Sequence, residues 1–165
     1  MKAALMPVLK PVYRGVAILV AHCALVLSVA GQYAWDRGHL PRAWANATPV
    51  DPESPIRGRY ITMHLRVEPA GAVGPYESVR LAAENGHLVA HADRKGALRL
   101  WGHAPDRLTL SEPVAFFIPE HLADPSRREN GEELWVEVSV PPKGPPRPIR
   151  LAVKKDGVLK PIEIR

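Results

Sequence analysis

The uncharged stretch from Gly15 to Trp35 limits what this chain can fold into more than any other feature. At about 1.5 Å of rise per residue, a helix of this length covers roughly 30 Å, the thickness of the hydrocarbon core of a bilayer. Apolar residues occupy every face of such a helix, whereas the amphipathic helix of a soluble protein needs a polar face. Residues 15–35 are therefore predicted to form a membrane-spanning helix.

The same pattern fits two kinds of segment, an uncleaved anchor and a cleaved signal peptide. Ser28 and Ala30 form a small-x-small pattern, so a signal peptidase would cut after Ala30. The apolar run continues to Tyr33 and Trp35, aromatic residues that suit a membrane interface and favour the anchor. More basic residues precede the span than follow it closely, which predicts residues 1–14 in the cytoplasm. Either way the remainder is exported, and we expect a bacterial inner-membrane protein with a periplasmic or extracytoplasmic domain.

The exported part has the size and charge of one globular domain. It comprises the 130 residues from Asp36 to Arg165, enough for a single core and too few for two. Its 19 basic and 17 acidic residues nearly balance, although the whole chain has a net charge of +5, so we expect no nucleic-acid partner. The only cysteine, Cys23, lies in the span, which excludes a disulfide within the domain.

Four prolines interrupt the segment after the span, so residues 36–56 are predicted to form an irregular linker. Beyond it, residues 57–67 alternate apolar and polar side chains, and residues 134–140 do the same. This is the period of a half-buried strand. Asn-Gly at positions 85 and 86 and Asp-Gly at positions 156 and 157 are typical of two-residue hairpin turns, because these residues tolerate positive φ.

The remaining pattern predicts a mainly β domain over residues 57–165. Pro161 cannot donate to a strand ladder, so the last strand is expected at a sheet edge. With the two strands above, a series of short strands separated by turn residues indicates an antiparallel β-sandwich or a partly open barrel. The further strands are predicted at residues 76–83, 87–91, 97–101, 108–110, 114–118, 149–154 and 158–164.

No motif in the chain points to a cofactor or a metal. The glycine-rich phosphate loops and the nucleophile elbow of α/β-hydrolases are absent from the sequence, and we expect no cofactor. His87 and His91 are the best-spaced pair of possible metal ligands. On a strand, however, four residues span about 13 Å, which is too far for one ion to bridge. We therefore expect no metal site.

Two alternatives assign a site to the domain. One is a membrane-anchored Ser/Lys hydrolase of the signal-peptidase type, with Ser54 as the nucleophile and Lys95 as a base kept neutral by burial. Lys95 lies, however, in a sequence typical of an exposed turn. The other is an envelope ligand-binding module that uses aromatic residues, although strand aromatics more often pack in a core. The aromatic residues in question are Tyr60, Trp101, Phe116 and Trp135.

The segment before and within the first predicted strand resembles the GDYXXLXY family, small bacterial membrane-anchored proteins of unknown function. Residues 50–65 read V-D-P-E-S-P-I-R-G-R-Y-I-T-M-H-L, and the family has a V-D-P-x-S-like approach followed by G-D-Y-x-x-L-x-Y. Residues 115–120 (A-F-F-I-P-E) and 131–136 (G-E-E-L-W-V) are similar to later segments of that family. The resemblance covers nearly the whole chain and implies an uncleaved N-terminal anchor.

The family motif is only partly kept. Gly58 and Tyr60 match it, whereas Arg59 replaces Asp, Met63 replaces Leu and Leu65 replaces Tyr. The apolar residues stay where a strand needs them, while the charge at position 59 is reversed. We therefore expect a structural or interaction subunit of an envelope membrane complex, with another membrane protein as its partner, and not an enzyme.

Overall fold

The computed structural model describes residues 11–50, 60–102, 104, 107–119 and 129–163. It contains one long apolar helix followed by an eleven-stranded sheet, which confirms the predicted mainly β fold. The chain divides into two compact units after His39, and each is described by itself.

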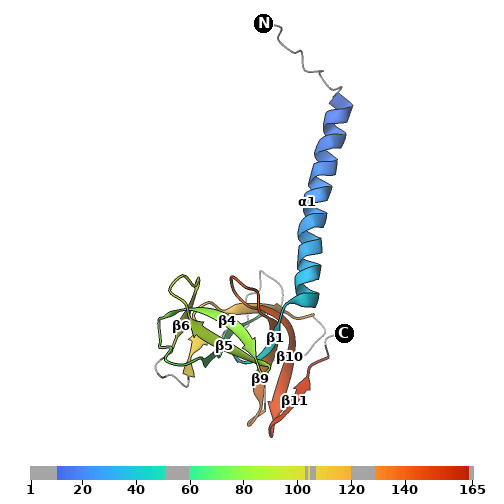
Figure 1. The fold of residues 1–165 in the computed structure, drawn as a ribbon. Coiled ribbons are helices and arrows are strands. Elements are labelled where there is room, and N and C mark those ends of the chain that lie inside the picture. The colour runs from blue at the N-terminus through green and yellow to red at the C-terminus, as the bar shows by residue number, and fades with distance from the viewer. Residues whose placement is uncertain (1–10, 51–59, 103, 105–106, 120–128, 164–165) are drawn as a thin grey trace. The chain divides into compact units, whose positions relative to one another are not determined.

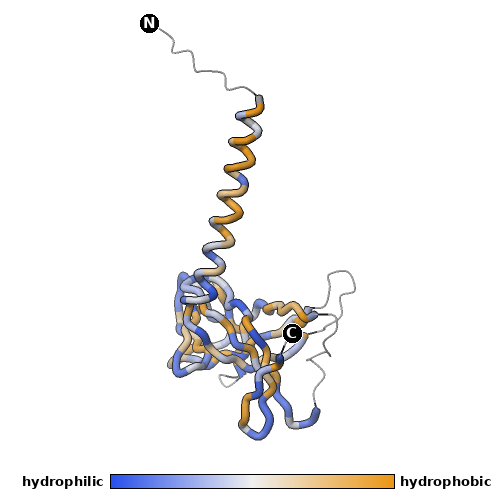
Figure 2. The backbone as a smooth tube through the Cα atoms, turned by 90° about the vertical axis from the view of Figure 1, so that its right-hand side faces the viewer, coloured by the Kyte–Doolittle hydropathy of each residue, from blue (hydrophilic) through white to orange (hydrophobic). Residues whose placement is uncertain are grey.

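Helix α1 (Pro11–His39) includes the whole predicted span and continues beyond Trp35 (Figure 1). Its stretch Gly15–His39 is long and apolar enough to cross a membrane, with a mean hydropathy of 1.9, and Figure 2 shows this apolar character along the helix. Inside this stretch, Nδ1 of His22 donates a hydrogen bond to the Ile18 carbonyl at 2.9 Å, so the polar ring has a partner within the helix. A membrane anchor and a signal sequence share these properties.

The strands of the second unit are short, and most agree with the predicted ones. They are β1 (Arg42–Pro49), β2 (Tyr60–Leu65), β3 (Glu68–Pro69), β4 (Ser78–Glu84), β5 (His87–Ala92), β6 (Leu98–Trp101), β7 (Thr109–Leu110), β8 (Val114–Phe117), β9 (Glu133–Ser139), β10 (Arg147–Lys155) and β11 (Val158–Pro161).

Strand pairing closes a small barrel. β1 pairs with β2, and the chain just past β2 joins β7 through a bridge between Arg66 and Thr109. β7 then pairs with β6, β6 with β4, and β4 with β5, all antiparallel. β5 returns to β1 in a parallel pairing that places Trp44 opposite His87. Two of these joints consist of a single residue pair, so the barrel is partly open, as predicted.

The other strands extend the sheet away from this ring. β9 pairs with the first half of β1, β10 with β9, and β11 with β10, while β8 pairs with β2 and β3 with β5. Pro161 lies on β11, the terminal strand of the order, as predicted for a residue that cannot donate to a ladder. Pro148 lies beside a shift of register in β10, another position where a strand tolerates proline.

An aliphatic core fills the inside of the sheet. Ile61, Met63 and Leu65 of β2 are fully buried, and the polar residues between them are not. Burying such a side chain contributes roughly 1.5–3 kcal/mol relative to leaving it exposed. The period-two pattern therefore identified the inward face of this strand correctly.

Both predicted two-residue hairpin turns are confirmed. Asn85 and Gly86 have φ values of 50° and 80° between β4 and β5. Asp156 and Gly157 have φ values of 52° and 80° between β10 and β11. Positive φ at both central positions is the geometry of a type I′ turn, which matches the twist of the flanking strands.

The prediction of an irregular linker at residues 36–56 is wrong for residues 36–39, which belong to α1, and for residues 42–49. The second of these segments is β1, the strand that joins β2, β5 and β9. Its prolines, Pro41 and Pro49, stand just before the strand and at its last position, where they do not interrupt the ladder. Its inward residues are alanines, which have weak strand propensity, so the local sequence did not indicate a strand.

Gly96 generates a testable prediction, because its backbone packs closely against β4. A Cβ atom at this position would lie 2.4 Å from the Val79 carbonyl oxygen, and the Gly96 N–H donates to the Asp93 carbonyl at 2.8 Å. We expect Gly96→Ala to lower the free energy of unfolding by about 1–3 kcal/mol, measured by urea denaturation of the full chain in detergent micelles. Gly74→Ala is the control, since its Cβ would meet only Glu77 at 3.7 Å, and we expect a change within about 0.5 kcal/mol. Equal effects of the two substitutions would contradict this account.

Candidate functional site

The aromatic residues of this chain lie outside its core. All ten of them (four Trp, four Tyr and two Phe) belong to the described residues, and none is buried. The expectation that Tyr60, Trp101 and Trp135 pack in the core is therefore wrong, while Phe116 is half-buried and packs against it. The buried side chains are aliphatic, and the sheet directs its aromatic rings outward. The outer faces of the strands are thus where a binding site is to be sought.

Two tryptophans on neighbouring strands form the centre of the most structured outer surface. Trp44 lies on β1 and Trp135 on β9, with Asn46 of β1 directly opposite Trp135. Glu137 lies opposite Trp44, and Arg150 of β10 opposite Glu137. We call the residues that interlock here the tryptophan cluster. Its members are Trp44, Asn46, Glu133, Trp135, Glu137, Arg150 and Lys154.

Cations cover both indole rings of the tryptophan cluster. The guanidinium carbon of Arg150 lies 5.4 Å from the centroid of the Trp44 ring, and Nζ of Lys154 lies 4.6 Å from that of Trp135. These are cation–π distances, at which the negative face of the ring attracts the charge. Nε of Arg150 also donates to the Glu137 carboxylate at 2.6 Å. Arg150 is therefore held by a ring on one side and a carboxylate on another.

Carboxylates fix the remaining polar groups of the tryptophan cluster. Oε2 of Glu133 accepts hydrogen bonds from Nε1 of Trp135 at 2.9 Å and from Nδ2 of Asn46 at 3.2 Å. The side chain of Glu137 is only 8% exposed, so its charge depends on Arg150 for compensation. The polar groups of this surface are thus held in place by contacts within the domain.

A small pocket opens beside the two tryptophans. It has a volume of about 50 Å³ and lies where β1 and β5 separate, with Val67 and Leu88 as apolar lining and Glu68 and His87 as polar lining. Nδ1 of His87 lies 3.0 Å from Oε1 of Glu68. A cavity of roughly 150 Å³ is needed to hold a benzene ring, so this pocket admits a methyl-sized tip or a water molecule. The pocket is thus a small hollow beside the tryptophan cluster.

The predicted family positions fall partly outside the described residues. Gly58 and Arg59 belong to the segment that is not described. Met63 and Leu65 are core residues of β2. Tyr60 begins β2, is 40% exposed and meets the ring of Phe117 edge-on at 5.7 Å between centroids. The motif positions that can be placed thus serve the core and one surface pair, and they do not converge on a site.

The residues of the proposed Ser/Lys pair are not brought together in the described structure. Ser54 lies outside the described residues. Lys95 is exposed in the turn between β5 and β6, and its backbone N–H donates to the Asp93 carboxylate at 2.9 Å. The burial that a neutral lysine base requires is not met at this position. No observation therefore favours the hydrolase.

The histidines of β5 each pair with their own carboxylate. His87 meets Glu68, and Nε2 of His91 lies 2.6 Å from Oε1 of Glu84. Across the described ranges, no group of three or more His, Cys, Asp or Glu side chains is placed to hold a metal ion.

Sequence reasoning missed Trp44 and Asn46 because their strand was not predicted. Trp135 carried a signal, since it shares its side of β9 with Glu133 and Glu137. A tryptophan flanked by charges at two-residue spacing lies on the polar face of a strand. Comparison of the chain with protein-family models, with curated proteins and with solved structures finds no match.

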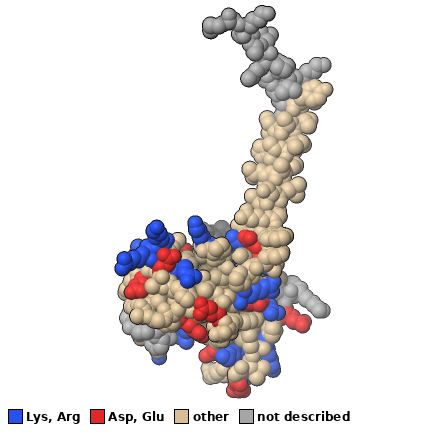
Figure 3. Space-filling model, in the orientation of Figure 1, with Lys and Arg blue, Asp and Glu red and all other residues tan. Residues whose placement is uncertain are grey.

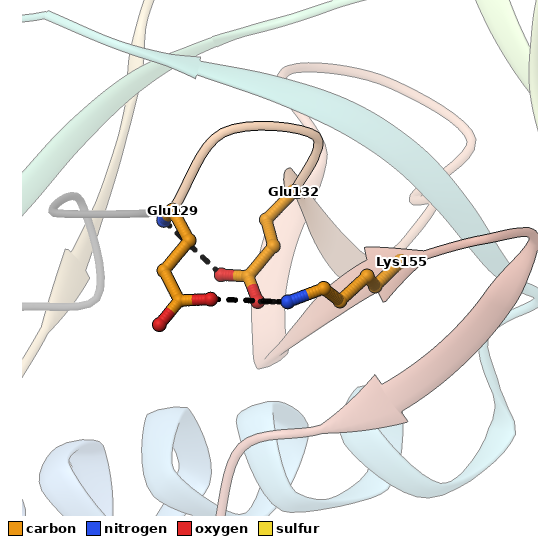
Figure 4. Close-up of polar contacts among 3 residues, drawn as sticks. All are labelled: Glu129, Glu132 and Lys155. Carbon is orange, nitrogen blue, oxygen red and sulfur yellow. Dashed lines mark hydrogen bonds and ion pairs between the residues drawn. The ribbon is translucent and has the colours of Figure 1, made fainter.

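Lys155, the last residue of β10 and the neighbour of Lys154, joins two carboxylates. Its Nζ lies 3.0 Å from Oε2 of Glu129 and 3.1 Å from Oε1 of Glu132, and the Glu129 N–H donates to Glu132 at 3.3 Å (Figure 4). The hydrogen bonds with Glu129 and Glu132 raise the pKa of Lys155 above its ordinary value of 10.5. A raised lysine pKa means that these contacts stabilise the folded state below pH 10.5 and that the contribution is lost as the pH rises through the folded-state pKa.

Replacing Arg150 tests the organisation of the tryptophan cluster. Arg150→Gln leaves the buried Glu137 carboxylate without its cation, and we expect a loss of about 1–3 kcal/mol in the free energy of unfolding. Adding Glu137→Gln removes the uncompensated charge, so the double variant should recover part of the loss. Lys160→Gln, on exposed β11, is the control and should stay within about 0.5 kcal/mol. Urea denaturation in micelles measures all three, and a double variant no more stable than the single one would speak against a buried carboxylate charge.

The carboxylate partners of Lys155 can be tested by titration. We expect Glu132→Gln to lower the pKa of Lys155 toward 10.5, because one raising contact is lost. The chemical shift of the Lys155 Cε carbon followed against pH by NMR measures this. Glu112→Gln, which removes an exposed carboxylate that does not contact Lys155, should leave the titration unchanged. An unchanged pKa in Glu132→Gln would mean that the contact is not formed in solution.

Proposed function

We propose that this chain is a single-pass protein of a bacterial inner membrane whose β domain acts as a structural or interaction subunit of an envelope membrane complex. Residues 1–14 would lie in the cytoplasm and the β domain in the periplasm or another extracytoplasmic space. The apolar stretch of α1 continues past Ala30 to Tyr33 and Trp35, which suit a membrane interface, and this supports an uncleaved anchor. The partner would be another membrane protein, and the chain would not be an enzyme.

The tryptophan cluster is the observation that carries this proposal. Interfaces between proteins are enriched in Trp, Tyr and Arg, and a few such residues supply most of the binding energy. Trp44, Trp135 and Arg150 bring these residue types together on one outer face, ordered by carboxylates and beside a small anchoring pocket. A partner side chain that enters this pocket would meet aromatic and apolar lining with a polar rim.

Membership of the GDYXXLXY family remains part of the proposal. The buried positions of Met63 and Leu65 support it, because both replacements keep the apolar character that the core of β2 requires.

A photo-crosslinking amino acid tests the proposed interface in cells. Thr48 is exposed two residues beyond Asn46, whereas Val158 on edge strand β11 is exposed and serves as the control position. We expect a specific membrane-protein crosslink from position 48 and none from position 158. Trp44→Ala with Trp135→Ala should weaken the crosslink at least about tenfold, since interface tryptophans contribute about 2 kcal/mol or more.

Three outcomes would contradict the proposal. A crosslink that persists in the double tryptophan variant would remove the tryptophan cluster from the interface, and equal crosslinking from both positions would indicate nonspecific contact. An alkaline phosphatase fused after Arg165 reports the orientation, because this enzyme becomes active only outside the cytoplasm. An inactive fusion would overturn the proposed topology.

A further inference from the structure

A second outer surface, on the opposite flank of the barrel strands from β9 and β10, gathers cations instead of ion pairs. Arg80 lies on β4, Arg99 on β6, and Arg94 and Lys95 on the turn between β5 and β6. All four are exposed, and Figure 3 shows Lys and Arg side chains, with some Asp and Glu side chains among them, on the part of the domain that carries β4 and β6 in Figure 1. We call these four residues with Trp101 the basic strip.

Strand register places the members of the basic strip on one face. Arg99 lies opposite Ser78, two residues before Arg80, so both arginines share the outer face while Val79 and Leu98 point into the core. Trp101 follows Arg99 at two-residue spacing on the same face of β6 and is 49% exposed. The arrangement is therefore built into the sheet and does not depend on chance side-chain positions.

The cations of the basic strip are not held in ion pairs within the described part of the chain. By contrast, Arg150 and Lys155 elsewhere in the domain form such pairs. Two carboxylates, Asp93 in the turn and Glu77 just before β4, lie beside the strip and keep their own charge, while Glu84 meets His91. The four cations outnumber these two carboxylates. The strip is thus a local positive surface on a domain whose total charge is nearly balanced.

An exposed tryptophan among cations has the composition of a membrane-interface surface. Trp favours the headgroup level of a bilayer, and Lys and Arg beside a membrane are attracted to anionic lipids. Only Leu40 and Pro41 separate α1 from β1 in the chain, so the domain is tethered to the helix by a very short connection. If α1 is the membrane anchor, the lipid headgroups of its own bilayer are the anionic surface present at the highest effective concentration.

We propose that the basic strip docks the β domain on anionic phospholipid headgroups of the bilayer that holds α1. This inference rests on the proposed membrane anchorage. Arg80, Arg94, Lys95 and Arg99 supply the attraction, and Trp101 inserts its ring at the headgroup level. Docking fixes which face of the domain rests on the membrane and leaves the tryptophan cluster, on other strands, for a protein partner.

Lysine acetylation of the full chain in nanodiscs tests this docking. Discs of phosphatidylcholine alone are compared with discs that also contain phosphatidylglycerol, and mass spectrometry gives the rate at each lysine. We expect acetylation of Lys95 to slow about fivefold or more in the anionic discs, since each cation near such a surface adds roughly fivefold to binding. Exposed Lys143 and Lys160 should react equally in both discs. About 1 M salt should abolish the difference, because the Debye length then falls to roughly 3 Å.

A matched pair of variants assigns the effect to the strip. Arg80→Gln with Arg99→Gln removes two strip cations and keeps Lys95 as the reporter, so the difference in the Lys95 rate between the two discs should largely disappear. Lys143→Gln with Lys160→Gln removes two exposed cations elsewhere and should leave the slowing at Lys95 unchanged.

Four outcomes would overturn the docking. The first is an equal acetylation rate of Lys95 in the two discs, and the second is slower acetylation in phosphatidylcholine discs alone. The third is slowing that persists in the Arg80→Gln, Arg99→Gln variant, and the fourth is slowing that occurs only when an acidic protein is added. A chain that is recovered outside the discs would instead refute the membrane anchorage itself. The failure of the docking and the failure of the proposed function are therefore distinguishable.

Discussion

The β domain depends on one strand, β1, and on the small side chains that let three neighbours approach it. Its first half pairs with β9, its second half with β2, and Trp44 meets β5 in parallel. Ala43, Ala45 and Ala47 are its inward residues, and all are buried. Larger side chains on this face would push the barrel and the β9–β11 extension apart, because cores of native density have no room for added volume. The alanines that weaken the strand locally are thus what its position in the sheet requires.

The same strand explains which parts of the fold can be predicted from sequence. β2 and β9 alternate β-branched or long apolar residues with polar ones, and the Asn-Gly and Asp-Gly turns act through φ at two positions, so local sequence identifies them. β1 has Ala, Asn and Pro where strand formers are expected, and only its three partners make it a strand. The parallel contact between Trp44 and His87 joins residues far apart in the chain, and no local pattern encodes it.

The candidate site was harder to predict than the fold, for a related reason. A period-two pattern separates the two faces of a strand, but hydrophobicity alone assigns an outward tryptophan to the core. Trp135 is outward because Glu133 and Glu137 share its face, and Trp44 because alanines occupy the inward positions of β1. The neighbours of Trp135 replace the contacts that a buried ring would make in a core. Lys154 lies over the Trp135 ring, and Glu133 accepts a hydrogen bond from the indole N–H. Covered in this way, a large aromatic residue can stay at a surface without exposing its whole ring to water.

The net charge of the domain does not reveal its positive surface, because ion pairs are unevenly distributed over the sheet. Acidic residues of β9, and of the segments joined to it, bind Arg150 and Lys155, while those near β5 bind His87 and His91. Cations on β4, β6 and the turn at residues 93–96 form no ion pair with a described residue. The composition of the domain counts these cations but does not show that they lie near one another. A domain with 19 basic and 17 acidic residues therefore still presents one positive surface. Nucleic acid is not the partner this surface suggests, since it has a single exposed tryptophan at one end of the strip rather than a row of stacking rings, and one interfacial aromatic on the same strand as a cation suits a headgroup layer.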